Sequence, residues 1–385
     1  MTPPPIRFAE VRAWLLDKAL PLWSGPGLDR RFGGSVEALD FSGADAALPV
    51  KRVRAQARQV YVFTHLDLLG AGSADAARHC WDFLSAKARR ADGAWARLLA
   101  RDGSIADGAA DAYDHAFILL ALAWRARAGE PGAVGEAHAT LDVLDRLLSL
   151  GPGRGWAAAE DRPQARLQNP HMHLLEAALE LTLVSGDQRF AEMARAILRL
   201  FETRLFEPER GLIYEDSAED WGALPRGASP VEPGHLFQWS WLLHRAGEVL
   251  GVDHRAEAAA LYRAAERLGT DPETGLTYDG LEGAGLEPVR TFRTWPQTEH
   301  LKAALGMFEH QGLDTRAEVA ALVGRLLDRY LAAPVAGGWV DRFGPGWTPL
   351  AQDMPASTFY HLLVAFSELL RLEPALSAAR ETAEA

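Results

Sequence analysis

The sequence predicts an all-α fold, an (α/α)6 barrel of twelve helices with short β-hairpin loops at one rim. Three observations favour it: a glycine turn that recurs six times, room for two helices in each interval, and similar first turns in alternate helices. A repeat architecture overrides the two or three domains that 385 residues would otherwise suggest. We therefore expect one catalytic barrel domain over residues 1–385.

The glycine turns set the repeat period. Each has a β-branched, aromatic or aliphatic residue within two positions of its glycine, as expected of a turn that leads into a short strand. The second or only glycines of the turns are Gly34, Gly93, Gly155, Gly211, Gly275 and Gly338. Their spacing of 56 to 64 residues gives a period near 60.

The segments between the turns are predicted to be helical. Apolar residues recur three and four positions apart, as in Leu174, Ala178, Leu179 and Leu183. Helix starts are expected near residues 6, 50, 73, 110, 135, 169, 187, 233, 253, 296, 315 and 355. An open helical solenoid has the same local pattern, so closure into a ring is an expectation of its own.

Five of the six helices that follow the glycine turns carry a proline at or near their start. These are Pro49, Pro170, Pro233, Pro296 and Pro355, whereas the helix that begins near Asp111 has none. Proline suits the first helical position because its missing N–H would have no helical partner there. If these helices form one parallel inner ring, their first turns meet at a single mouth.

The same first turns carry polar and aromatic side chains that we expect to line a pocket. The candidate catalytic residues are His235 and His361, and the candidate substrate-binding residues are Arg58, Tyr113, Asn169, His173, Glu176, Glu232, Gln238, Trp295 and Glu299. Further aromatic walls are expected from Trp239, Trp241 and Phe237. Aromatic walls with a few directed polar groups fit a ligand of the size of a sugar.

Several of these residues also have a purely structural interpretation. Asn169 and Glu232 could be N-caps of their helices, and Glu299 could pair with Arg293. Arg58 lies within an inner helix, so it needs either a carboxylate partner or an oxygen-rich ligand. Histidines near a helix N-terminus are expected to remain neutral near pH 7, the form that a general base requires.

Composition excludes some functions. A net charge of −12 argues against binding to nucleic acid or to an anionic membrane. The single cysteine, Cys80, fits a reducing compartment, and the apolar run 117–124 is too short to span a bilayer, so a cytoplasmic protein is expected. His171 and His173 are two positions apart and point in different directions on a helix, so no metal site is expected.

Five stretches resemble the N-acylglucosamine 2-epimerase superfamily, which includes mannose isomerases and cellobiose 2-epimerases. They are KRVRAQARQVYVF, NPHMHLLEA, EPGHLFQWSWLL, RTWPQTEHLKA and PASTFYHLL, within a similarity that extends from about residue 30 to 370. The resemblance implies an (α/α)6 barrel and cofactor-independent proton transfer at C2 of a reducing sugar. It assigns His235 and His361 as the acid/base pair, Arg58 and His173 as ligands of the sugar oxygens and of the enediolate, and Trp295 and Glu299 as a stacking and a polar partner.

Gln238 departs from the family pattern, which usually has glutamate three residues after the histidine of the PGH motif. An amide can hydrogen-bond a hydroxyl group but cannot exchange a proton as a carboxylate does. The closer similarity of EPGH and RTWPQTE to mannose isomerases favours aldose–ketose isomerisation of a free sugar such as D-mannose, through an enediol. The partner is thus a small-molecule sugar, and the chain is expected to be a monomer or a homodimer.

Other functions stay open on the sequence alone. The first alternative is a sugar 2-epimerase of the N-acylglucosamine, mannose/glucose or cellobiose type. A second is an isomerase of a phosphorylated or sulfonated sugar, with Arg54 or Arg226 as the anion partner. A glycoside hydrolase that uses Glu232 and Glu299 and a non-catalytic helical scaffold are the remaining alternatives.

Overall fold

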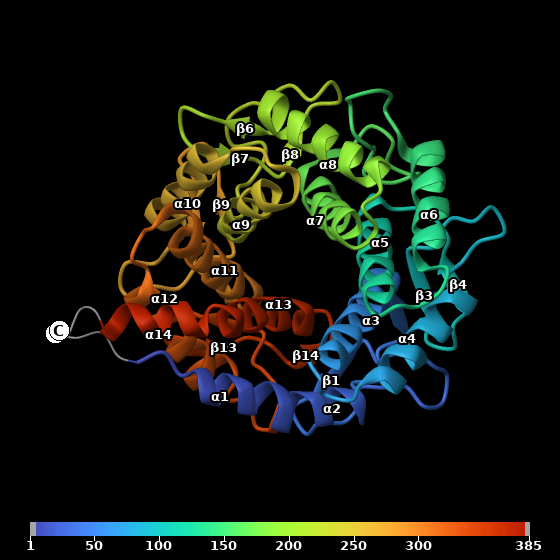
Figure 1. Ribbon diagram of the computed structural model, residues 1–385, viewed down its shortest axis with the longest axis horizontal. Helices are drawn as coiled ribbons and strands as arrows, with labels where there is room; N and C mark the ends of the chain where they lie inside the picture. Colours follow the sequence, from blue (N-terminus) through green and yellow to red (C-terminus); the bar gives the residue numbers. More distant parts are fainter. Residues whose placement is uncertain (1–4, 382–385) are drawn as a thin grey trace.

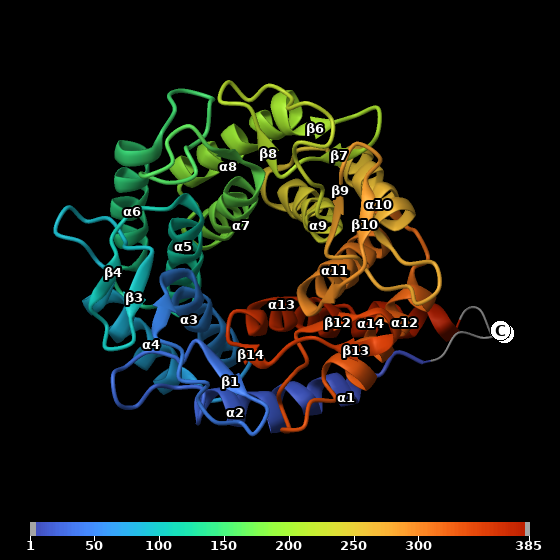
Figure 2. The same cartoon turned by 180° about the vertical axis from the view of Figure 1, so that it is seen from behind.

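The computed structural model describes residues 5–381, with side chains to residue 378, and shows two concentric rings of helices (Figures 1 and 2). The inner ring consists of α3 (Val53–Leu68), α5 (Ala112–Arg127), α7 (Gln168–Ser185), α9 (Pro233–Leu250), α11 (Thr294–Gln311) and α13 (Thr358–Arg371). These six helices are buried on most sides, because the outer ring covers them and their neighbours flank them.

The outer ring begins with a rod that runs from α1 (Phe8–Ala13) through a π-helical segment, Trp14–Ala19, to α2 (Leu20–Ser24). It continues with α4 (Ala74–Lys87), α6 (Ala133–Leu148), α8 (Gln188–Leu200), α10 (Arg255–Gly269) and α12 (Arg316–Arg325). Further π-helical segments, Phe201–Leu205 and Leu326–Tyr330, extend α8 and α12. After α13 the chain forms α14 (Glu373–Glu381).

The ring is closed. Inner helices pack against their neighbours in chain order, and α13 also packs against α3, the first inner helix. The strand β1 (Ala38–Asp40) pairs antiparallel with β14 (Asp353–Pro355), which joins the first repeat to the last a second time. The prediction of an (α/α)6 barrel is therefore confirmed, and the open solenoid is excluded.

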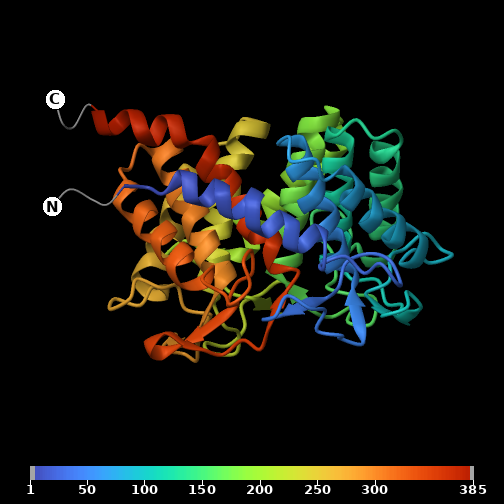
Figure 3. The ribbon, with the colours of Figure 1, turned by 90° about the horizontal axis from the view of Figure 1, so that it is seen from below.

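Short strands gather at one rim of the barrel, along the lower edge in Figure 3. They form small antiparallel sheets, several of which link neighbouring repeats. The remaining strands are β2 (Val50–Arg52), β3 (Leu98–Ala100), β4 (Ile105–Asp107), β5 (Arg166–Leu167), β6 (Phe206–Glu207), β7 (Leu212–Ile213), β8 (Asp216–Ser217), β9 (Gly280–Glu282), β10 (Glu287–Val289), β11 (Phe292–Arg293), β12 (Arg342–Gly344) and β13 (Thr348–Pro349), with a short 3-10 turn at Pro345–Trp347.

The inner helices do not all start at their proline. Pro233 is the first residue of α9, as predicted. Pro170 and Pro296 are instead the third residues of α7 and α11. This position is also tolerated, because the first turn of a helix has no internal acceptor for its N–H groups. Pro49 and Pro355 lie ahead of α3 and α13, before or at the end of the adjoining strand.

A polar side chain near the start of four inner helices fixes the preceding glycine turn. Each accepts a hydrogen bond from the backbone N–H that follows the turn, which satisfies a buried donor. The bonds are Ser35 N to Gln56 Oε1 (2.8 Å), Trp95 N to His115 Nε2 (3.4 Å), Trp156 N to His171 Nε2 (3.0 Å) and Thr277 N to Gln297 Oε1 (2.9 Å). This repeated bond anchors each turn to its helix and thereby sets the height of the first helical turns at the rim.

None of the helices in residues 5–381 combines the length and the apolar character needed to cross a membrane.

Candidate active site

A polar cavity of about 300 Å³ opens where the inner helices begin. The residues that line it come from repeats all around the ring. They are Arg52, Arg58, Tyr113, Asn169, His173, Glu232, His235, Arg293, Trp295, Asp341, Pro355, Ser357, Thr358 and His361. Its volume matches the lower end of small-molecule sites, which fits a monosaccharide.

Eight of the eleven predicted site residues reach this cavity: Arg58, Tyr113, Asn169, His173, Glu232, His235, Trp295 and His361. The other three, Glu176, Gln238 and Glu299, lie behind its wall and are buried. The expected aromatic wall is smaller than predicted. Trp239, Trp241 and Phe237 are buried and do not line the cavity. Phe237 packs on Tyr262 and Trp239 on Phe201, both of the outer ring, whereas Trp241 packs on Lys302 of α11.

Trp295 lies between the two candidate acid/base histidines. Its ring centroid is 4.9 Å from that of His235 and 5.7 Å from that of His361. The two imidazoles, 126 positions apart in the chain, therefore lie at one small cavity beside the same indole. An indole ring is an apolar surface on which a sugar ring can stack.

In each of the three histidines of the cavity, Nδ1 is hydrogen-bonded to a carboxylate. His235 Nδ1 is 2.8 Å from Glu215 Oε1, His361 Nδ1 is 2.7 Å from Glu299 Oε1, and His173 Nδ1 is 3.2 Å from Glu176 Oε2. Such a bond holds the ring in place and keeps the proton on Nδ1. Nε2 is then the nitrogen of each ring that is free to meet a ligand.

His235 lies in an acidic environment. Burial lowers the pKa of His235, but the charges of Glu215 and Glu232 outweigh burial and raise this pKa above its usual value. The helix dipole alone predicted a lowered pKa for His235, and the shift in its actual surroundings has the opposite direction. Two nearby carboxylates have a larger effect than the partial charge of a helix end.

His361 and His173 have the opposite tendency. Burial is the main cause that holds the pKa of His361 well below its usual value, and Arg58 and Lys302 lower it further. Burial also lowers the pKa of His173 to about 4, against the opposing effect of Glu176. Both rings are therefore neutral near pH 7, whereas the pKa of His235 is shifted in the opposite direction.

Arg58 has no carboxylate partner within ion-pair distance among residues 5–378. Its guanidinium donates to the Tyr113 hydroxyl at 2.8 Å and lies 4.1 Å from the Phe117 ring centroid, while its Nε has no partner in the same part of the chain. A buried cation without a counter-charge is costly. The sequence suggested that Arg58 needs either a carboxylate partner or an oxygen-rich ligand. Because the described structure has no such carboxylate, the oxygen-rich ligand remains.

Neither predicted helix cap makes a capping hydrogen bond through its side chain. Asn169 is the second residue of α7, whose N-cap is Leu167, and its buried Oδ1 has no hydrogen-bond partner in the described structure. Glu232 does occupy the N-cap position of α9, but its side chain makes no capping bond. Both side chains line the cavity instead.

Glu215, the partner of His235, was missed in the sequence. Gln168 holds it: Gln168 Nε2 donates to both Glu215 oxygens at 2.9 and 3.1 Å, and Trp239 Nε1 donates to Gln168 Oε1 at 2.7 Å. A signal was present, since an acidic residue follows the glycine turn by three or four positions in several repeats. These residues are Glu37, Glu215, Asp279 and Asp341.

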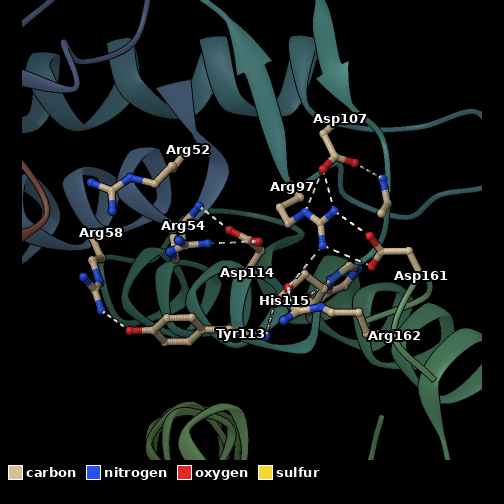
Figure 4. Close-up of polar contacts among 12 residues, drawn as sticks. Arg52, Arg54, Arg58, Arg97, Asp107, Tyr113, Asp114, His115, Asp161 and Arg162 are labelled. Carbon is tan, nitrogen blue, oxygen red and sulfur yellow. Dashed lines mark hydrogen bonds and ion pairs between the residues drawn. The ribbon is translucent and has the colours of Figure 1, made fainter. Parts of the chain in front are cut away.

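The arginines at the start of α3 face different partners (Figure 4). Arg58 reaches Tyr113, whereas Arg54 turns to Asp114, with 3.6 Å between Nη1 and Oδ2. Neither Arg54 nor Arg226 lines the cavity, which corrects the expected anion partners. The arginines that do line it, besides Arg58, are Arg52 and Arg293, which were not predicted.

One group of side chains at the cavity and behind its wall has donor atoms close enough to hold a metal ion. Atoms of Glu215, Glu232 and His235 lie within 4.8 Å of one another. In this group, however, His235 Nδ1 is already hydrogen-bonded to Glu215 at 2.8 Å, and Gln168 donates to the same carboxylate. These donor atoms therefore already have partners within the protein. A second group, Glu248, Glu309 and His310, is largely exposed and pairs with arginines.

Comparison with known proteins gives the context of this site. The profile of the N-acylglucosamine 2-epimerase (GlcNAc 2-epimerase) family matches residues 33–365. The chain belongs to this family. It is therefore an enzyme of the sugar isomerase and epimerase group, as the resemblance of the five motifs implied.

Relatives of both reaction types are similar to this family member. A mannose-6-phosphate isomerase of Rhizobium meliloti is 35% identical and covers 94% of this chain and 97% of its own. A D-mannose isomerase of Thermobifida fusca is 29% identical, over 75% of this chain and 76% of its own. A solved cellobiose 2-epimerase of Spirochaeta thermophila, 22% identical over 94% of this chain and 96% of its own, shares the fold with a TM-score of 0.85.

Proposed function

We propose that this enzyme interconverts an aldose and a ketose, with D-mannose or its 6-phosphate as the aldose. The observation that supports this most is the pair of imidazoles with opposite pKa shifts beside one indole. Two titratable groups whose surroundings separate their pKa values are suited to act as acid and base at one substrate.

In the proposed reaction His361 is the base. Its neutral Nε2 removes the proton from C2 of the open-chain sugar, and the electron pair moves to the C1 carbonyl oxygen. Protonated His235 delivers a proton to that oxygen, which gives an enediol. His235 then takes the proton of the C2 hydroxyl while C1 accepts the proton held by His361, which yields the 2-ketose and restores both rings. Each role matches the direction in which the surroundings shift the pKa of the ring.

Arg58 stabilises the negative charge that develops on oxygen in this reaction. Its guanidinium is buried and always charged, and lies at the cavity with no carboxylate partner in the described chain. A fixed cation at the position of a developing oxyanion lowers the barrier by about 3 kcal/mol in comparable sites. Asn169 and His173 supply further polar groups to the sugar hydroxyls.

The phosphorylated sugar is the second candidate substrate because of the cavity's arginines. Arg52 and Arg293 line the cavity in addition to Arg58, and their side chains are each about one-third exposed. Guanidinium groups bind phosphate bidentately. The relative with 35% identity is a mannose-6-phosphate isomerase, which adds support to this substrate for the present chain.

The hydrolase alternative has less support from the geometry. Glu299 has a fully buried side chain and contacts Lys302 and His361 behind the wall. It therefore cannot reach a glycosidic oxygen as the opposed carboxylate of a hydrolase must.

The proposal is tested by incubating the full chain with mannose, mannose 6-phosphate, glucose, cellobiose and N-acetylglucosamine, with NMR analysis of the products. We expect fructose or fructose 6-phosphate, at a rate unchanged by prior dialysis against a chelator. Formation of the C2 epimer alone would make the enzyme an epimerase. Absence of turnover with every sugar would contradict the proposal.

A further inference from the structure

The barrel holds a buried lysine next to the candidate site. Lys302 lies on α11, three residues after Glu299, and both side chains are 0% exposed. Its Nζ is 2.7 Å from Glu299 Oε2 and 4.1 Å from the centroid of the Trp241 ring. Lys302 does not line the cavity. A charged pair at this depth has a large desolvation cost, so either charge alone would be strongly disfavoured.

Glu299 connects this lysine to His361. One of its oxygens faces Lys302, and the other lies 2.7 Å from His361 Nδ1. Burial raises the pKa of Glu299, and Lys302 is the first of the groups that oppose this rise. The charge state of Glu299 therefore depends on the ammonium group.

We propose that Lys302 is a positioning residue that keeps Glu299 ionised, so that Glu299 fixes His361 as the Nδ1–H tautomer with an unprotonated Nε2 toward the cavity. This rests on the proposed function, in which Nε2 of His361 removes the C2 proton. The inference adds a residue that never touches the sugar.

The tautomer follows from the charge on Glu299. An ionised carboxylate can only accept a hydrogen bond, so the imidazole must donate from Nδ1. A protonated Glu299 has an O–H that donates to Nδ1, and the neutral ring would then carry its proton on Nε2. In that state the lone pair of the ring is on Nδ1, which faces Glu299, and Nε2 has no lone pair with which to remove the C2 proton. Loss of Lys302 should therefore reduce catalysis with little change in sugar binding.

The first test replaces Lys302 with a neutral side chain of similar length, Lys302→Met. We expect kcat to fall about 100-fold, at the lower end of the range for general acid–base catalysis, with KM within about threefold. The matched control is Lys51→Met, because Lys51 is also buried (2% exposed) and its Nζ is 2.9 Å from Asp29 Oδ2. The control should lose stability but keep kcat within about threefold. A Lys302→Met enzyme that folds and keeps kcat within threefold overturns the inference.

The second test reads the tautomer directly and needs no substrate. Nitrogen-15 NMR of the full chain with labelled histidine, assigned by comparison with His361→Gln, should show His361 neutral with its proton on Nδ1. Lys302→Met should move the proton to Nε2. A wild-type His361 with its proton on Nε2, or in the imidazolium form, overturns the inference even if Lys302→Met fails to fold. A wild-type enzyme with no sugar turnover would refute the proposed function, while the NMR result would still decide on Lys302.

Discussion

His235 and His361 are the same residue type in opposite surroundings. Glu215 and Glu232 raise the pKa of His235, whereas burial with Arg58 and Lys302 lowers that of His361. The partners come from distant segments: Glu215 precedes β8, and Lys302 is on α11. A difference in neighbours thus separates the two roles that the proposed reaction needs.

The acid role of His235 predicts a shifted pH profile for Glu215→Gln. His235 is protonated below its pKa, and Glu215 raises that pKa, so removal of the carboxylate lowers it. The alkaline limb of kcat/KM should therefore move to lower pH. Glu219→Gln, an exposed residue four positions on, is the control and should leave the limb in place. An unchanged limb in Glu215→Gln would show that His235 is not the acid.

Gln238 places a neutral amide in the interior of the barrel, where several charged side chains are also buried. Arg58 and Lys302 supply two cations, and Glu176 and Glu299 can supply two carboxylates. The neutral amide of Gln238 adds no charge, and both of its polar atoms are buried without a partner in the described structure. A glutamate here would be a third carboxylate in the same interior.

At the scale of elements, the sequence predicted the helices well and their polar partners poorly. Inner-helix starts fell within about three residues of the expected positions, because apolar periodicity and proline report local structure. The bonds of Gln168 with Glu215 and of Glu299 with Lys302 depend on side-chain packing, which periodicity does not encode. Arg52 and Arg293 were missed for a similar reason: they precede their helices and reach the cavity only through the path of β2 and β11.

The hydrogen bond that anchors a glycine turn to its inner helix, here Trp156 N to His171 Nε2, leads to a prediction about stability. Two glycine-to-alanine substitutions in the same turn should lower the free energy of unfolding by different amounts. Gly153 and Gly155 both have φ near +70°, so alanine is strained at either site. A Cβ at Gly153 meets nothing within 4 Å, whereas one at Gly155 would overlap His171 Nε2, which Trp156 N holds in place. Gly153→Ala should cost about 1 kcal/mol and Gly155→Ala about 3 kcal/mol with the added overlap. Urea denaturation measures both, and equal losses would contradict the anchor.

At the scale of the molecule, the site exists only because the ring closes. Arg58 from the first repeat and His361 from the last line the same cavity, and the packing of α13 on α3 brings them together. The repeats predicted six helix pairs, and closure into a barrel was an added expectation, since an open solenoid has the same local pattern. Closure depends on contacts between the first and last repeats, the packing of α13 on α3 and the pairing of β1 with β14. Local sequence patterns do not report such contacts.

Buried histidine couples the stability of the molecule to pH. Burial lowers the pKa of His171 to about 4, from 6.5 in the unfolded chain. The contribution of neutral His171 to the free energy of unfolding is therefore lost as the pH falls from 6.5 toward 4. His171→Gln keeps an acceptor, as Gln56 and Gln297 do in their repeats, but does not titrate. The free energy of unfolding of the variant relative to wild type should therefore rise by about 2 kcal/mol between pH 7 and pH 5. A difference that does not change with pH would contradict a neutral, buried His171.

The central claim is that His361 removes the C2 proton of the sugar. Proton NMR in D2O measures this directly, as the exchange of the C2 hydrogen of recovered mannose or mannose 6-phosphate during turnover. The account predicts exchange with wild type and with the control His171→Gln, and a loss of at least about 100-fold with His361→Gln. Exchange that persists at the wild-type rate in folded His361→Gln would contradict it.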